Sequence, residues 1–246
     1  MKLSKRLKFF LSHLAVSAII ALIAVVAVFW FWYPAPLAQA VGVTHIFLML
    51  LAIDVIIGPV LGFMVYKEGK KTLKMDLSII ILLQALALGY GVYSIFEGRP
   101  AWLAYNVDRF ELVRNNEIIT DHIEQAQPQY QHPSWLKPQI VAVEFAQDHQ
   151  TRQNEMFAEV LGGISIAQRP ERYVPFSQAK TQLQQRAQPL ITLKQLNNPA
   201  TVDQILKQYP EATAWVPLKA NAVDMVVLLN KKKAEVIKIV DLRPWK

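Results

Sequence analysis

The chain has 246 residues, a formal net charge of +7 and no cysteine, and 53% of its residues are hydrophobic. The absence of cysteine excludes disulfide bonds and cysteine-ligated metal sites. Within residues 1–96, eight Lys or Arg residues stand against three acidic residues, so this segment carries +5 of the net charge. The remaining +2 is spread over residues 97–246, which argues against a nucleic-acid partner.

Three apolar stretches predict membrane-spanning helices at about residues 9–32, 43–66 and 77–96. Each stretch has the roughly 20 apolar residues that a helix needs to cross about 30 Å of hydrocarbon. Basic residues precede the first stretch, and others occupy the turn between the second and third, at Lys67, Lys70, Lys71 and Lys74. By the positive-inside rule, these four lysines set the topology: the N-terminus and the turn are cytoplasmic, and everything after Phe96 is outside.

The first stretch ends in the aromatic cluster of residues 29–33, which is typical of a membrane interface. Pro34 and Pro36 then open an external loop. Small residues at positions 38 and 40 also match a signal peptidase site, so cleavage after Ala40 is an alternative. Because the apolar run is longer than the core of a signal peptide and ends in aromatic residues, we expect the first helix to be retained.

Asp54 is the one ionisable acid of the second stretch, where a charge in hydrocarbon costs several kcal/mol unless it is partnered or neutralised. Counting about 1.5 Å per residue from Tyr66 and from Leu77 puts Tyr90 closer in depth to Asp54 than Gln84. Tyr90 is therefore the predicted partner. Two roles stay open for Asp54, namely stabilising the helix bundle and engaging a partner helix.

Small residues spaced four apart on the second and third stretches predict close packing of membrane helices. Gly58 pairs in this way with Gly62, Gly89 with Ala85, and Gly91 with Ala87. His45 lies near the external end, on the helical face opposite Asp54. The candidates for bundle packing or for contact with a partner in the membrane are His45, Asp54, Gly58, Gly62, Gly89, Tyr90 and Gly91.

Residues 97–246 predict an extracytoplasmic α+β domain, distinct from the membrane domain of residues 1–96. Strands are predicted at about 101–113, as one strand or a pair, and at 139–146, with a Gln- and Pro-rich loop at 124–138. Helices are predicted at 150–160, at 177–186 with Ser177 as its cap, and at 202–209. The last three strands, 213–219, 222–230 and 235–241, predict an antiparallel meander.

No catalytic motif is present in the sequence. The histidines of the C-terminal domain, His122, His132 and His149, are too widely spaced to suggest a zinc site. Asp108 and Arg109, beside Asn106, predict a buried polar cluster or an ion pair. We therefore expect no catalytic, cofactor-binding or metal-ligating residue, no cofactor, and a protein that is not an enzyme.

Two segments carry a resemblance to a known family, namely WYPAPLAQAVGVTHIFLMLLAIDVIIGPVLGFMVYKEGKKTLKMDL and LALGYGVYSIFEGRPAWLAYNVDRFELV. They are similar to the type IV pilin accessory proteins of the TfpX and TfpZ group, also called FimB-like. The resemblance is strong over residues 1–115 and continues in character to the C-terminus. The matched positions are His45, Asp54, Gly58, Pro59, Lys67, Glu68, Gly69 and Asp108, which are candidates for structure or partner contact.

The resemblance implies an inner-membrane accessory factor that assists pilin stability, pilus assembly or retraction, and hence twitching motility. Pilin waits in the inner membrane by its apolar N-terminal helix with its head outside, so the expected partners are pilin, the membrane and the pilus assembly machinery. We expect the second and third helices to receive the pilin helix and the periplasmic domain to contact the head. A membrane-anchored periplasmic sensor, or less favourably an enzyme with an external catalytic domain, is the alternative. The oligomeric state stays open.

Overall fold

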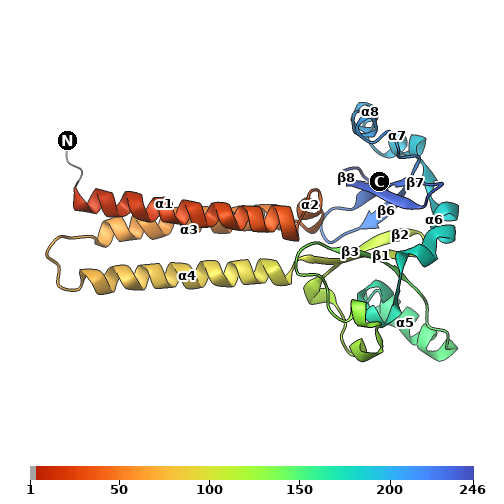
Figure 1. Ribbon diagram of the computed structural model, residues 1–246, viewed down its shortest axis with the longest axis horizontal. Coiled ribbons are helices and arrows are strands. Elements are labelled where there is room, and N and C mark those ends of the chain that lie inside the picture. The colour runs from red at the N-terminus through yellow and green to blue at the C-terminus, as the bar shows by residue number, and fades with distance from the viewer. Residues whose placement is uncertain (1–3) are drawn as a thin grey trace. The chain divides into compact units, whose positions relative to one another are not determined.

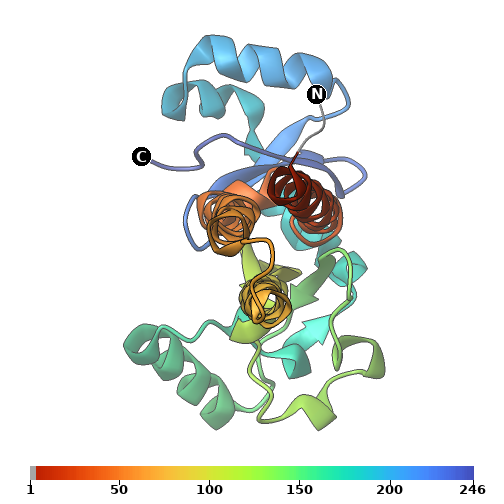
Figure 2. The same cartoon turned by 90° about the vertical axis from the view of Figure 1, so that its left-hand side faces the viewer.

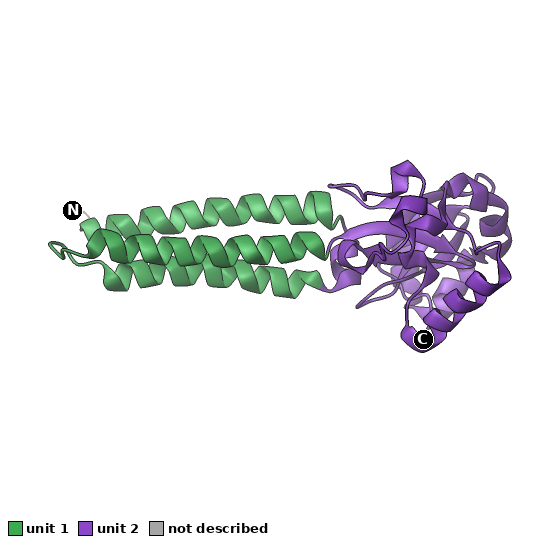
Figure 3. Cartoon of the chain, turned by 90° about the horizontal axis from the view of Figure 1, so that it is seen from below, with its two compact units in different colours: residues 1–34, 43–98 green, residues 35–42, 99–246 purple. Residues whose placement is uncertain are grey.

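The computed structural model describes residues 4–246 and divides into two compact units (Figure 3). The first unit comprises residues 1–34 and Val43–Gly98, and the second comprises Ala35–Gly42 and Arg99–Lys246. The first unit is helical, and the second contains a mixed sheet with helices. The segment 35–42 thus belongs to the second unit, although in the sequence it connects two helices of the first.

The first unit consists of three helices that are long and apolar enough to cross a membrane (Figure 1). They are α1 (Lys5–Val26), which continues through a π-helical segment (Ala27–Trp32), α3 (Val43–Val65) and α4 (Leu73–Glu97). Three apolar helices were predicted at these places, and all three are present. Helix α4 begins four residues before the predicted start at residue 77.

The early start of α4 has an electrostatic cause. Asp76 lies in the first turn of α4, where a negative charge is favoured by the helix dipole. Its carboxylate also accepts a hydrogen bond from the Thr72 hydroxyl at 3.1 Å and pairs with Lys70 Nζ at 2.7 Å. A length and hydropathy criterion misses this turn of helix because two of its four residues, Lys74 and Asp76, are charged.

At the other end of the helices, aromatic side chains join α1 to its neighbours. Phe29 packs edge-on against Phe47 of α3, and Trp32 packs against Phe96 of α4, with ring centroids 5.6 Å and 5.0 Å apart. The Tyr33 hydroxyl is buried and donates to the Ile95 carbonyl at 2.7 Å. The aromatic cluster therefore contributes to the bundle itself, while Trp30 remains exposed.

The second unit is organised around one curled sheet. Its strands are β1 (Pro100–Asn106), β2 (Arg109–Arg114), β3 (Gln139–Val143), β4 (Tyr173–Val174), β5 (Gln188–Pro189), β6 (Ala214–Lys219), β7 (Met225–Asn230) and β8 (Glu235–Val240). They are ordered β4-β3-β1-β2-β6-β7-β8, with β5 paired to β6. The predicted meander is present as β6, β7 and β8.

The sheet as a whole is mixed, because two of its strand pairs outside the predicted meander are parallel. Strand β3 pairs parallel with β1, and β6 pairs parallel with β2. Parallel neighbours require long connections, and here the chain makes an excursion of 24 residues between β2 and β3 and a longer one before β6. Such pairings join residues far apart in sequence and leave no local pattern.

Five α-helices belong to the second unit: α2 (Leu37–Val41), α5 (His149–Gly162), α6 (Lys180–Arg186), α7 (Leu193–Leu196) and α8 (Pro199–Gln208). Asn198 caps α8 by accepting from the Ala200 backbone N–H at 2.9 Å. The predicted cap Ser177 was wrong, because it lies inside the 3₁₀ segment Phe176–Ala179 and α6 begins only at Lys180.

Both faces of the sheet carry buried side chains. Successive residues of a strand point to opposite faces, so one strand contributes to the cores on both sides. Leu103 and Tyr105 of β1 contribute to one apolar cluster, whereas Trp102 and Ala104 contribute to another. A third cluster forms around Trp215 of β6, packed by α7 and α8. The core of the unit thus consists of three apolar clusters, formed without disulfide bonds.

Helix α2 is part of this core. Leu37 and Ala40 are buried in the same cluster as Leu103, and the Ala40 carbonyl accepts from the backbone N–H groups of Ala222 and Val223 at 2.9 and 3.1 Å. Gly42 ends α2 with φ of +82°, and a Cβ there would lie 2.8 Å from Ala222 Cβ. The predicted external loop is thus a docked helix.

We predict that Leu37→Ala lowers the free energy of unfolding of the second unit by about 2–5 kcal/mol, because it leaves a cavity in the core. The matched control is Leu136→Ala, which truncates an exposed leucine of the same unit and should change stability by about 0.5 kcal/mol or less. Thermal unfolding of the full chain in detergent, followed by limited proteolysis, measures both. Equal effects of the two substitutions would contradict the docking of α2.

Candidate functional site

A groove of about 680 Å³ lies in the helical unit, between α1 and α4. Figure 2 looks along the three helices. Helix α3 packs against both α1 and α4, and it contributes one residue, Asp54, to the groove. The other lining residues come from α1 and α4: Phe9, Ser12, His13, Val16, Ser17, Ile20, Ile23, Ala24, Ala27, Ile81, Gln84, Ala85, Leu88, Gly89 and Val92. The groove is therefore apolar along most of its length and polar at Asp54.

The side-chain amide of Gln84 joins all three helices at this point. Its nitrogen donates to Ser17 Oγ of α1 at 3.0 Å, and on α3 to the Asp54 carbonyl at 3.0 Å and to Asp54 Oδ2 at 3.3 Å. Its oxygen lies 2.9 Å from His13 Nε2. Because an amide oxygen can only accept, His13 must donate from Nε2. We call His13, Ser17, Asp54 and Gln84 the polar cluster.

The predicted pairing of Asp54 with Tyr90 was wrong. Asp54 lies eleven residues before Val65, where α3 ends, and Gln84 lies eleven residues after Leu73, where α4 begins. The depth count failed because it began at Leu77 and so placed Gln84 too near the helix end. The Tyr90 side chain is 74% exposed and lies outside the polar cluster.

The glycines predicted for close packing differ in their surroundings. A Cβ at Gly58 would lie 1.9 Å from Gln84 Oε1, at Gly62 2.9 Å from Phe9 Cε1, and at Gly91 2.5 Å from Leu50 Cδ2. These three glycines allow close approach within the bundle. Gly89 has no such neighbour within 4 Å and lines the groove.

His45 and the four lysines that were predicted to set the topology are exposed. His45 lies on α3 away from the groove, and Lys67, Lys70, Lys71 and Lys74 lie in the turn before α4 or in its first turn. Lys5 of α1 lies 3.4 Å from Glu68 in the same turn. Near it, Arg6 donates to the Phe63 carbonyl at 2.6 Å and stacks over the Phe63 ring, a contact that the sequence did not reveal.

In the second unit, the predicted pair of Asp108 and Arg109 forms an ion pair at 2.8 Å, partly exposed rather than buried. Asn106 donates instead to Glu111 at 2.9 Å. Over residues 4–246, the structure contains no group of three His, Asp or Glu side chains placed to hold a metal ion. These contacts give the hairpin of β1 and β2 an ordered polar end.

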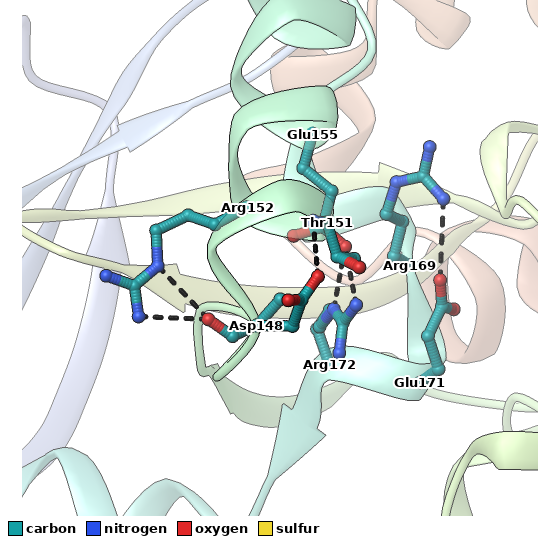
Figure 4. A network of polar contacts seen from close by, with 8 residues as sticks. Asp148, Thr151, Arg152, Glu155, Arg169, Glu171 and Arg172 are labelled. Carbon is teal, nitrogen blue, oxygen red and sulfur yellow. Dashed lines mark hydrogen bonds and ion pairs between the residues drawn. The ribbon is translucent and has the colours of Figure 1, made fainter.

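Helix α5 has its polar side turned inward (Figure 4). Glu155 is buried and pairs with Arg172 at 2.8 Å, while Arg152 donates to the Ala146 carbonyl at 2.9 Å. The opposite side carries four apolar residues that are between 56% and 81% exposed, and we call them the α5 stripe: Met156, Phe157, Val160 and Leu161. An exposed apolar patch on a folded domain is typical of an interaction surface.

Sequence reasoning missed His13, Ser17 and the α5 stripe. His13 and Ser17 are spaced i, i+4 on α1 and so share one face, which could have marked them as a pair. The stripe also has helical periodicity, but such a pattern is ordinarily assigned to the core. Periodicity alone does not tell which side of a helix meets the domain.

We predict that Gln84→Leu destabilises the helical unit by about 0.5–2 kcal/mol, because polar groups of three residues, His13, Ser17 and Asp54, then lose a hydrogen-bond partner in an apolar bundle. The control Tyr90→Phe removes a hydroxyl from an exposed side chain and should leave stability unchanged. Resistance of the full chain to unfolding by SDS measures both. If Tyr90→Phe destabilised the unit more than Gln84→Leu does, Tyr90 rather than Gln84 would be the partner of Asp54.

Comparisons with known proteins were made on the sequence and on the fold. The family model described as fimbrial assembly protein FimB matches residues 1–42. Fimbrial assembly proteins of Dichelobacter nodosus from serogroups E1 and I are 28% and 27% identical over 228 residues, which cover 89% of this chain and 88% of each relative. The protein of serogroups C1 and C2 is 30% identical over 116 residues, which cover 46% of this chain and 88% of that relative. No solved structure matches. The chain therefore belongs to the FimB-like family of fimbrial assembly proteins.

Proposed function

We propose that the protein acts in type IV pilus biogenesis as an inner-membrane factor that binds pilin and assists its stability, assembly or retraction. The relatives from Dichelobacter nodosus are named fimbrial assembly proteins, which supports a role in pilus biogenesis. In this proposal, the N-terminus and the turn after α3 are cytoplasmic and the second unit is periplasmic. The protein works by binding and carries out no catalytic step.

Exposed apolar side chains on all three long helices support insertion into the membrane. Leu22 of α1, Met64 of α3 and Leu83 of α4 are each more than 60% exposed, as are further residues of each helix. A water-soluble bundle buries such residues, whereas lipid solvates them. Lysines at both predicted cytoplasmic ends agree with the positive-inside rule.

The observation that carries the proposal is the groove between α1 and α4. Its walls are apolar, it is open along the bundle, and Gly89 and Ala85 leave space on the α4 side. A single membrane helix of another protein fits such a site, because helices associate in lipid through close packing and interhelical hydrogen bonds. We assign the pilin helix to this groove rather than to the faces of α3 that Gly58 and Gly62 occupy within the bundle.

The α5 stripe supports contact between the second unit and the pilin head or the assembly machinery. It exposes Met156, Phe157, Val160 and Leu161 together on one side of a helix that Glu155 fixes to the domain from the other side. When a partner covers apolar side chains clustered in this way, binding is favoured by about 25 cal/mol for each Å² of apolar surface removed from water. Folded domains that act as monomers in water rarely expose a large contiguous apolar cluster.

We predict that Ala85→Trp, which fills the groove, strongly reduces the number of surface pili, whereas Leu86→Trp does not. Leu86 is the next residue along α4 and is exposed outside the groove, so it controls for the added bulk. Complementation of a deletion strain, electron microscopy of pili and twitching assays measure the outcome, with immunoblots to establish equal protein levels. Normal piliation with Ala85→Trp would contradict a role for the groove.

We predict that Leu161→Glu also reduces piliation but leaves the fold intact, because the side chain is exposed and should change stability by about 0.5 kcal/mol or less. Leu136→Glu makes the same substitution at an exposed leucine of this unit outside α5 and is the control. Pilus counts and thermal unfolding of the purified protein provide the two measurements. Wild-type piliation with Leu161→Glu would remove the α5 stripe from the proposal.

A further inference from the structure

Asp54 is the one residue that α3 contributes to the groove, and it lies in the polar section of a groove that is apolar along most of its length. It is also the one acidic residue between Phe9 and Tyr66. A carboxylate at this depth is costly in hydrocarbon unless hydrogen-bond donors or a cation surround it. The surroundings of Asp54 therefore indicate what a ligand of the groove must supply.

The polar cluster donates one hydrogen bond to the Asp54 carboxylate, and that bond is long. Gln84 divides its two N–H groups among Ser17 Oγ, the Asp54 carbonyl and Asp54 Oδ2, and the bond to the carboxylate is the longest of the three, at 3.3 Å. His13 uses its Nε2–H on Gln84. The hydroxyl hydrogen that Ser17 retains is one that a helical serine ordinarily donates to a carbonyl of the preceding turn. A carboxylate has about four acceptor sites, so most of those on Asp54 are left to a ligand.

No Lys or Arg of the described helices pairs with Asp54, and His13, the basic side chain of the polar cluster, hydrogen-bonds Gln84 instead. The ion pairs within residues 4–98 join Lys5 to Glu68 and Lys70 to Asp76, both at the end of the unit where the turn lies. From Phe9 to Tyr66 and from Leu77 to Phe96 the chain contains no Lys or Arg. Within the described helices, the Asp54 carboxylate therefore has no direct hydrogen bond from a cationic group, and a ligand of the groove can supply one.

We propose that the groove recognises a membrane helix carrying a cationic hydrogen-bond donor, an amino or guanidinium group, which pairs with Asp54. This inference rests on the proposed function, which supplies the pilin helix as the occupant, and it adds the chemistry by which that helix is selected. The apolar walls contact the body of the helix, and Asp54 fixes its depth and rotation. A helix without a cation would leave the carboxylate unpaired and bind more weakly.

The experiment uses the full chain in native membranes, with a photocrosslinking amino acid at Leu88 in the groove or at Leu86 outside it. Each probe replaces a leucine, so it adds less bulk to the groove than a probe at Ala85 would. Crosslinking to pilin is compared among wild-type Asp54 and the variants Asp54→Glu, Asp54→Asn and Asp54→Leu. Asp54→Asn keeps an oxygen that can accept from Gln84, so it removes the charge without removing the acceptor. Protein levels and SDS resistance of each variant establish that the bundle is folded.

We expect pilin crosslinks at Leu88 and none at Leu86. Asp54→Asn and Asp54→Leu should reduce the crosslinks at Leu88 about tenfold or more, the effect of losing one charge-assisted hydrogen bond, and Asp54→Glu should retain most of them. Unchanged crosslinking in the neutral variants overturns the cation proposal and leaves the proposed function standing. Crosslinks at Leu88 to lipid or to a second copy of this chain, without pilin, overturn both.

A charge exchange provides a second test. Asp54→Lys should abolish crosslinking at Leu88, and replacing the cationic residue of the pilin helix by Glu should restore it in that variant alone. Failure of every such exchange to restore crosslinking would overturn the pairing. A pilin helix that has no cationic group, including its α-amino group, at the depth of Asp54 would do the same.

Discussion

The side-chain amide of Gln84 is the interaction on which the helical unit most depends, because its hydrogen bonds reach both other long helices. Polar groups surrounded by apolar residues have no water to satisfy them, so they must satisfy one another. Gly58 is part of the same constraint, since a Cβ at that position would collide with the Gln84 amide oxygen. The register of α4 against α1 and α3 therefore follows from one amide and from the glycine that admits it.

This constraint also explains why the helical unit has an open side. Helix α3 packs against both α1 and α4. The long side chain of Gln84 reaches from α4 to Ser17 of α1 within the polar cluster. A bundle joined by a long polar side chain does not need its two outer helices to touch along their length. The space between them is the groove, and the acidic residue at its base is the one that the amide satisfies least.

Local sequence patterns predicted those features that depend on residues near one another in the chain. Apolar length predicted the three long helices, and alternation predicted β6, β7 and β8. The parallel pairs of β1 with β3 and β2 with β6 depend on where long excursions return, and no local pattern encodes that. The partner of Asp54 was mispredicted because a four-residue error at the start of α4 shifts depth by about 6 Å. The orientation of α5 was hidden because its apolar side faces outward.

The burial of α2 has a consequence for the order of events during synthesis. Leu37 and Ala40 leave the ribosome early, but the Ala222 and Val223 amides that bind the Ala40 carbonyl are made some 180 residues later. At a translation rate of about 5–20 residues per second, this segment waits roughly 10–40 seconds for its partners. During that interval its apolar side chains have no core to enter. The ribosome thus makes α1 and α3 well before it makes the connection from β6 to β7, which binds α2. Completion of the second unit is therefore tied to the end of translation.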